Sequence, residues 1–154
     1  MTRVKRAVLV LAVCAGAAIA CAGGASPAPL QPGTPCSQCR MTVLDARLAA
    51  QLVAPGEEPR FFDDVGCLVA YLSSHPANGA SRAYVTDHQA GEWIEASRAV
   101  YGRDEALATP MSSHLFAHAS SASRSSDTSV HAGRILTADE VFGAVGVPGG
   151  GHGR

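Results

Sequence analysis

One segment near the middle of the chain carries apolar residues at helical spacing. These residues are Val65, Leu68, Val69 and Leu72. Asp63 or Asp64 can accept hydrogen bonds from the free N–H groups of a first turn, and the polar run at residues 73–76 ends in a proline that stops a helix. We therefore predict a helix that begins after Asp64. Capping and the helix dipole explain the two adjacent carboxylates better than acid–base catalysis does.

Short apolar stretches around this helix predict strands. The loop-forming run Pro55-Gly56-Glu57-Glu58-Pro59 separates two of these stretches, and a turn at residues 89–91 separates two others. The predicted strands are residues 41–45, 48–53, 61–62, 83–87 and a segment that begins at residues 93–94. The first half of the chain therefore predicts a small sheet with one helix.

The second half repeats the order of two short strands, a helix and a strand. We assign these elements to residues 99–101, 107–111, 115–130 and 135–136. Residues 120–129 are rich in serine and would form a weak helix alone. A short capped helix at residues 137–142 and a loose tail from Pro148 follow. The predicted fold class is α+β, with two ββαβ units.

The first 20 residues have the pattern of an export signal. Its charged start consists of Arg3, Lys5 and Arg6. Residues 7–20 are apolar or small, and they are too few to cross a bilayer core of about 30 Å. Small residues precede Cys21, as in bacterial lipoprotein signals, so we expect a lipidated Cys21 that anchors the chain to a membrane of the cell envelope, facing the periplasm. The alternatives are lipidation at Cys14 or an ordinary signal peptide cut near Ala20.

The rest of the chain predicts one compact domain on a flexible tether. Residues 22–35 are mostly Gly, Ala, Ser and Pro, a composition typical of disorder. The predicted organisation is a signal peptide at 1–20, a lipidated cysteine and tether at 21–35, a binding domain at 36–143 and a disordered tail at 144–154. Three of the 12 Lys and Arg residues lie in the leader, so nine remain against 13 Asp and Glu, a net charge of −4. No nucleic-acid partner is expected for this charge.

Two thiols and a thioether occur within six residues at the start of that domain. They belong to Cys36, Cys39 and Met41. Soft sulfur donors favour Cu(I), whereas a structural zinc site needs four ligands. A disulfide or a redox pair is the alternative for the cysteines, and a packed core position is the alternative for Met41. If a strand begins at Cys39, its side chain and that of Met41 share a face.

A second group of donors lies in the second half. Met111 and His114 stand in a polar turn, where they can be ligands or, alternatively, a core methionine and a surface histidine. Cys67 has apolar neighbours and fits a buried small residue better than a ligand. His118 could be a further donor but fits packing or capping better. Four histidines in polar segments are predicted to lie at the surface: His75, His88, His131 and His152.

Several motifs follow one another in a fixed order between residues 36 and 142. They are Cys-x-x-Cys-x-Met from Cys36, Phe62-Asp63-Asp64-Val65-Gly66-Cys67, Tyr84-Val85-Thr86-Asp87, Glu92-Trp93-Ile94, residues 99–101 and Thr109-Pro110-Met111. In this order they resemble the NosL family of copper-binding lipoproteins, which are accessory to nitrous oxide reductase. The resemblance implies two related ββαβ units, similar to the non-catalytic architecture of organomercurial lyase, and delivery of Cu(I) in the periplasm. Arg40 and Ser112 stand where this family usually has glycine.

Two function classes follow from these observations. The first is a lipoprotein copper carrier, not an enzyme, that passes Cu(I) to an apo-cuproenzyme such as nitrous oxide reductase. A copper exporter is a further candidate partner. An incompletely filled metal shell lets a ligand of the partner attack the ion, so Cu(I) is never released. The expected ligands are Cys36, Cys39, Met41, Met111 and His114. The alternative is a thiol–disulfide reductase that uses the two nearby cysteines to keep those of a copper protein reduced.

Overall fold

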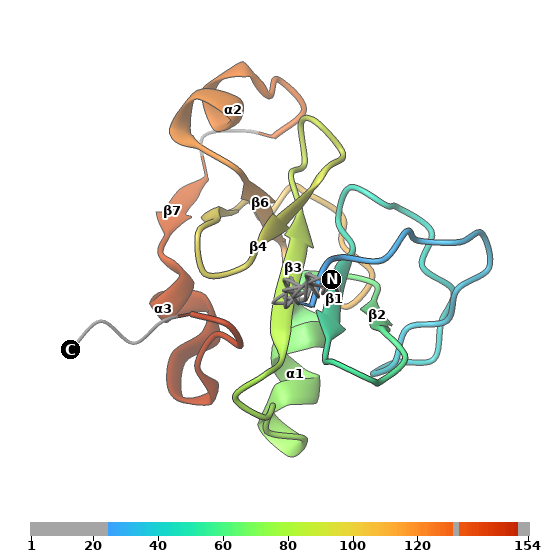
Figure 1. Cartoon of the computed structure of the whole chain (residues 1–154). Helices are drawn as coiled ribbons and strands as arrows, with labels where there is room; N and C mark the ends of the chain where they lie inside the picture. Colours follow the sequence, from blue (N-terminus) through green and yellow to red (C-terminus); the bar gives the residue numbers. More distant parts are fainter. Residues whose placement is uncertain (1–24, 131–132, 151–154) are drawn as a thin grey trace, which may run out of the picture.

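The computed structural model describes residues 25–130 and 133–150 (Figure 1). The predicted signal peptide, the lipidation site at Cys21, and His131 and His152 lie outside these residues. Within them, no helix has the length and apolar character needed to span a membrane. The fold is mixed α and β, with two small antiparallel sheets and a few helices, in agreement with the predicted class.

The first half builds a four-stranded antiparallel sheet. Its strands are β1 (Ala50–Val53), β2 (Arg60–Phe62), β3 (Arg82–Thr86) and β4 (Trp93–Glu95), in the order β2-β1-β3-β4. Helix α1 (Val65–Ser74) connects β2 to β3. It begins where the sequence predicts, because Asp64 is its N-cap and accepts the Cys67 N–H at 2.7 Å. The apolar residues Val65, Leu68 and Leu72 are all buried.

The second half builds a three-stranded antiparallel sheet. Its strands are β5 (Val100–Arg103), β6 (Leu115–His118) and β7 (Arg134–Leu136), in the order β6-β5-β7. Helix α2 (Ser121–Ser126) connects β6 to β7. Helix α3 (Ala138–Phe142) and the short 3-10 helix η1 (Gly143–Val145) follow. In both halves the first strand therefore lies between the other two strands of its ββαβ run.

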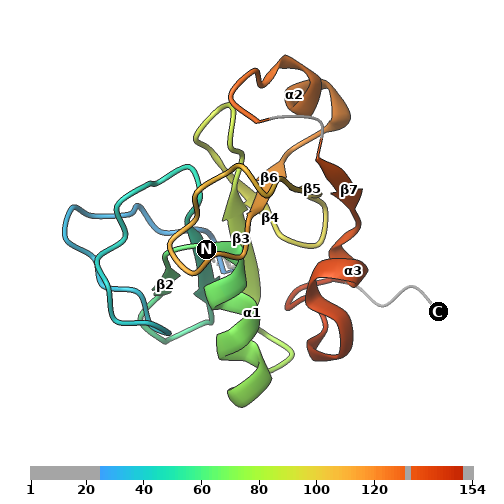
Figure 2. The same cartoon turned by 180° about the vertical axis from the view of Figure 1, so that it is seen from behind.

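The two sheets meet where β3 ends. Asp87 and Ala117 form a parallel bridge, and the N–H of His88 donates to the carbonyl of Ala117 at 2.8 Å. One core cluster continues from the first half into the second, where it includes Tyr101 and Phe142. Figures 1 and 2 show α1 and α2 at opposite ends of the molecule.

The structure corrects the predicted second helix. Residues 115–118 form β6, and only residues 121–126 are helical, so the long helix at 115–130 is wrong. The predicted strands at 41–45 and 107–111 are loops and turns. Ser120 is the N-cap of α2 and accepts the N–H of Ser123 at 3.1 Å. The helix therefore begins at the serine-rich run and does not include the strand before it.

The chain on both sides of the predicted domain is more ordered than its composition indicates. Gln51 is fully buried, and its side-chain amide pairs with the N–H and C=O of Ala28 at 2.8 and 3.1 Å. A buried amide needs such partners, so residues near Ala28 pack against β1 where the sequence predicts a disordered tether. At the other end, the carbonyl of Pro148 accepts the N–H of Ala83 at 3.1 Å, so part of the predicted tail lies beside β3.

Candidate metal centre

A tight turn holds Cys36 and Cys39 together. The N–H of Cys36 donates to the carbonyl of Met41 at 2.7 Å, and the N–H of Arg40 donates to the carbonyl of Cys36 at 3.0 Å. Arg40 has a φ of 68°, in the left-handed region that glycine adopts more easily. The N–H of Ser37 donates to the carbonyl of Phe61 at 2.8 Å, which fastens the turn to β2. The thiols therefore lie beside the chain that leads from β2 into α1.

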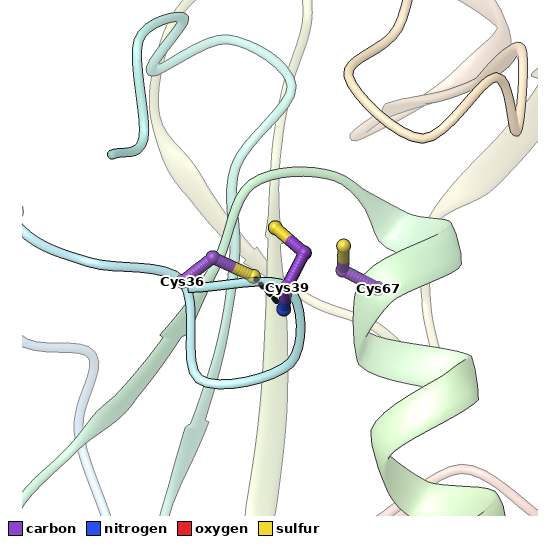
Figure 3. A group of neighbouring side chains, drawn as sticks. All are labelled: Cys36, Cys39 and Cys67. Atoms are coloured by element: carbon purple, nitrogen blue, oxygen red, sulfur yellow. Dashed lines mark hydrogen bonds between the residues drawn. The ribbon is translucent and has the colours of Figure 1, made fainter. Parts of the chain in front are cut away.

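Cys67 brings a third sulfur to the same place. It lies in the first turn of α1, where its N–H is bound by Asp64. The Sγ atoms of Cys36, Cys39 and Cys67 all lie within 4.8 Å of one another, and Figure 3 shows the three side chains converging from the turn and from the helix. Cys36 and Cys67 are buried, and Cys39 is partly exposed. The sequence predicts Cys67 as a core residue, and it is buried, but its sulfur also belongs to this cluster.

The three thiols of the cluster ionise unequally. Burial opposes ionisation of Cys36, but hydrogen bonds from the backbone N–H groups of Cys39, Asp63 and Gln38 outweigh it and lower the pKa of this thiol. Burial raises the pKa of Cys39 and of Cys67, and the nearby Cys36 raises both further. Cys36 is therefore the first thiolate to form. A metal ion that binds there displaces the protons of the other two.

The geometry of the cluster suits a soft metal ion. Three sulfurs that share one ion at a bond length of about 2.3 Å lie about 4 Å apart. Each sulfur–sulfur separation here is at most 4.8 Å, so none must shorten by more than about 0.8 Å to reach that value. Three protein sulfurs are fewer than the four ligands of a structural zinc site, and thiolates are ligands that Cu(I) prefers. The cluster can therefore hold a metal ion and leave its shell open to a further donor.

The two methionines predicted as ligands are both about half exposed. The exposed fraction is 48% for Met41 and 52% for Met111, so a packed core position is wrong for either. Met41 lies outside the strands, and the bridge beside it pairs Thr42 with Pro35. No strand begins at Cys39, so the condition for a strand face shared by Cys39 and Met41 is not met.

The loop between β5 and β6 packs against the start of α1. Ser113 Oγ donates to Asp64 Oδ2 at 2.9 Å, and Asp64 binds the N–H of Cys67 with its other oxygen. A Cβ added to Gly66 would lie 2.5 Å from the Cβ of Ser113, so this close approach requires glycine. Met111 belongs to this loop and is thereby brought to the same end of α1 as the cysteine cluster.

His114 lies in the same loop, but its ring contacts the loop itself. Its Nδ1 lies 2.9 Å from the carbonyl oxygen of Leu107, and its Nε2 lies 3.6 Å from Glu105 Oε2. Both ring nitrogens of His114 therefore face atoms of the loop itself. Ser112 and His114 have φ values of 53° and 58°, so the loop is held in a left-handed conformation at both residues.

Of three further histidines that the structure describes, only His88 lies where the sequence does not predict it. His75 is at the surface as expected and stacks on Tyr71, with ring centroids 4.3 Å apart. His88 is predicted at the surface, but it is only 2% exposed, because the β3–β4 turn packs against β6 and α2. His118 is fully buried, in line with the packing role weighed for it.

The order of motifs and the cysteine cluster agree with a comparison against protein families. The family model of NosL matches residues 27–145. The chain belongs to the NosL family. No curated protein matches the chain at a significant level. Membership suggests a copper-binding accessory function, and the three-cysteine cluster could hold the metal. The match begins inside the predicted tether, consistent with the ordered contacts of Ala28.

Proposed function

We propose that this NosL-family protein is a Cu(I) carrier whose metal-binding core is the cluster of Cys36, Cys39 and Cys67. The observation that carries this proposal is the convergence of three sulfurs within 4.8 Å of one another from two separate segments of the chain. Cu(I) is the cargo of the protein and is expected to arrive at Cys36, the thiol with the lowered pKa. The three core ligands are all soft sulfur donors, so the site is expected to bind few metal ions other than Cu(I).

Release of the ion depends on the flanking loops. Met41 and Met111 offer exposed thioethers on the two segments that border the cluster, and His114 adds an imidazole. A thioether is a neutral, weaker donor than a thiolate, so a shell that includes one exchanges more readily with an incoming ligand. We therefore propose that Met111 and His114 assist capture and transfer, while the cysteines provide most of the affinity.

The setting of this transfer is also a proposal. The leader and Cys21 support a lipoprotein anchored in the cell envelope and facing the periplasm, and family membership supports delivery to a cuproenzyme such as nitrous oxide reductase. A copper exporter is the candidate supplier. We further propose that the two halves are related ββαβ units, because each places its first strand between the other two.

A competition titration with a chromogenic Cu(I) chelator under anaerobic, reducing conditions tests the carrier function. We expect one Cu(I) per chain. Cys36→Ser, Cys39→Ser and Cys67→Ala should each weaken binding by more than the roughly 10–100-fold typical of outer-shell substitutions. Val65→Ala is the matched control for Cys67→Ala, because it removes apolar volume from the buried face of the same helix but no sulfur. Cu(I) affinity that is unchanged in Cys67→Ala would contradict the three-sulfur site.

A second set of variants separates the carrier from a thiol–disulfide reductase. A reductase needs Cys36 and Cys39 but has no use for a thioether. Met111→Leu keeps the side-chain volume and should cost less than about 1.5 kcal/mol of stability. We expect it to weaken Cu(I) binding, with a smaller effect from His114→Ala. If both variants bind Cu(I) as the parent does, and the Cys36–Cys39 pair turns over a disulfide substrate, the reductase is the better assignment.

A further inference from the structure

A buried group of two imidazoles and a carboxylate lies at the junction of β6, α2 and the β3–β4 turn. His88 Nδ1 is 2.6 Å from Asp127 Oδ2, and His118 Nε2 is 3.0 Å from the same oxygen. The exposed fractions of these side chains are 2%, 0% and 1% for His88, His118 and Asp127. One potential ligand atom from each residue lies within 4.8 Å of the others. None of these residues is a sulfur donor, so the group differs in kind from the cysteine cluster.

The carboxylate is oriented toward the two rings by bonds on its far side. Asp127 Oδ1 accepts the N–H of Ser129 at 2.9 Å and the Oγ–H of Ser129 at 2.5 Å, which leaves Oδ2 to the imidazoles. His88 is held by its own N–H, which bonds the carbonyl of Ala117, the residue before His118. Carboxylates and imidazoles that ligate a metal are typically oriented by outer hydrogen bonds of this type.

Hydrogen bonding alone leaves this group incomplete. Both rings must donate a proton to a single oxygen, and the second ring nitrogen of His118, Nδ1, is buried without a partner among the residues that the structure describes. An ion bound between Oδ2 and the two ring nitrogens that face it would remove the need for two protons at one oxygen, whereas Nδ1 of His118 carries a proton in the bound state. Oδ2 and the two ring nitrogens that meet at it are ligand types that Zn²⁺ accepts.

We propose that His88, His118 and Asp127 form a second metal site, which takes a divalent ion of borderline softness, such as Zn²⁺ or Cu²⁺, and not Cu(I). Ligand atoms that share a zinc ion at about 2.0–2.1 Å lie about 3.3 Å apart in a tetrahedron. The two nitrogen–oxygen separations of 2.6 and 3.0 Å must therefore widen by less than about 1 Å. On binding, each ring presents a lone pair to the ion and carries its remaining proton on the other nitrogen.

The expected role of this ion is structural. Helix α2 buries none of its side chains and reaches the rest of the protein through polar contacts. An ion held by the residue that ends α2, by the end of β6 and by the β3–β4 turn would tie these three segments together. The site would therefore stabilise the second half of the fold without taking part in the sulfur chemistry of the first.

A metal titration of a cysteine-free chain tests this site. All five cysteines are replaced, Cys67 by alanine and the others by serine, so that no thiol competes for the ion. We expect this chain to bind one Zn²⁺ by calorimetry, to bind Cu²⁺ in a separate experiment, and to melt at a higher temperature with either ion. Adding His118→Gln should abolish these effects, and adding Ser129→Ala should weaken binding by about 10–100-fold. His75→Gln is the matched control, a surface histidine outside the group.

A spectroscopic measurement keeps the test decisive if the cysteine-free chain does not fold. Co²⁺ added to the full chain with its cysteines intact should give visible bands of a nitrogen- and oxygen-bound ion, which His118→Gln removes while any thiolate charge-transfer bands remain. The proposal would be overturned if both sets of bands persisted in His118→Gln. So would a folded cysteine-free chain that takes up neither Zn²⁺ nor Cu²⁺, or that takes up Cu(I) at these residues instead.

Discussion

Helices α1 and α2 occupy equivalent places in the two halves, after the second strand of each ββαβ run, yet different forces hold them. Helix α1 buries Val65, Cys67, Leu68 and Leu72 against the first sheet. Helix α2 buries no side chain and is held by polar contacts: Ser123 Oγ bonds both oxygens of Asp87 at 2.9 and 2.8 Å, and Arg124 donates to the carbonyl of Gly133 at 2.9 Å.

This difference extends to the chemistry at the helix ends. The start of α1 carries a thiol within a cluster of sulfurs, whereas the residue that ends α2, Asp127, binds two imidazoles. An apolar helix is fixed by burial, which is independent of any single partner. A polar helix depends on a few directional contacts, and loss of one buried partner costs about 1–3 kcal/mol, less than truncation of a large buried apolar side chain. Burial of apolar surface therefore holds α1, whereas polar partners hold α2.

The largest effect is expected in α1. Leu68 is fully buried, so Leu68→Ala should lower the free energy of unfolding by about 2–5 kcal/mol through lost burial and a residual cavity. Chemical denaturation followed by circular dichroism measures this loss. Arg124→Ala on α2 is the comparison, and an equal loss there would show that α2 is no less critical than α1.

The next effect is expected at the end of α2. In metal-free protein, Asp127→Asn replaces an acceptor of two imidazole contacts by an amide, which leaves a buried ring nitrogen unpaired and should cost about 1–3 kcal/mol. Hydrogen exchange of the backbone amides measures whether the loss is local. We expect faster exchange in α2 and the β3–β4 turn than in α1. Uniform acceleration throughout the protein would mean that the two halves unfold as one unit.

A gain in stability is expected at the two turns that border the cysteine cluster. Arg40 and Ser112 have positive φ values, which cost a non-glycine residue about 1–2 kcal/mol. Arg40→Gly and Ser112→Gly should therefore each raise the free energy of unfolding by about 1 kcal/mol. The greater conformational entropy that glycine gives the unfolded chain reduces this gain. Arg47→Gly is the control, because Arg47 is also in a turn but has no positive φ, so glycine should destabilise there. Destabilisation in all three variants would show that the positive φ values of Arg40 and Ser112 do not strain the backbone.

The smallest effect is expected at α3, a helix fixed by its own neighbours in sequence. Glu140 accepts the backbone N–H of Thr137 at 2.8 Å, and this bond, with Arg134 beside it, lowers the pKa of Glu140 below its ordinary 4.5. A depressed folded pKa stabilises the protein above pH 4.5, and the contribution disappears as the pH falls through the folded value. Thermal melts of Glu140→Gln and of the parent should therefore differ at pH 7 and converge near pH ~3. If the two melting temperatures still differed at low pH, the destabilisation in Glu140→Gln would be due to lost packing.

Local rules in the amino-acid sequence predict several elements of this fold. Helix α1 is set by apolar spacing and the Asp64 cap, and α3 by the capping pair of Thr137 and Glu140. Most strands, the mixed fold and the family were also readable, because alternation, turns and ordered motifs lie in short stretches of chain. The soft-donor cluster was readable in part, since Cys36 and Cys39 are only three positions apart.

Contacts between residues that are distant in sequence depend on how the two sheets pack. Cys67 joins the cluster because the turn at Cys36 is fastened to β2 and β2 leads directly into α1. His88, His118 and Asp127 are each unremarkable in sequence and become a buried group only when β3 and β6 are bridged. The physical reason is that a hydrogen-bonding or metal-binding side chain in a polar segment carries no periodic signal. Its role depends on which atoms the packing of the two sheets brings within about 3 Å of it.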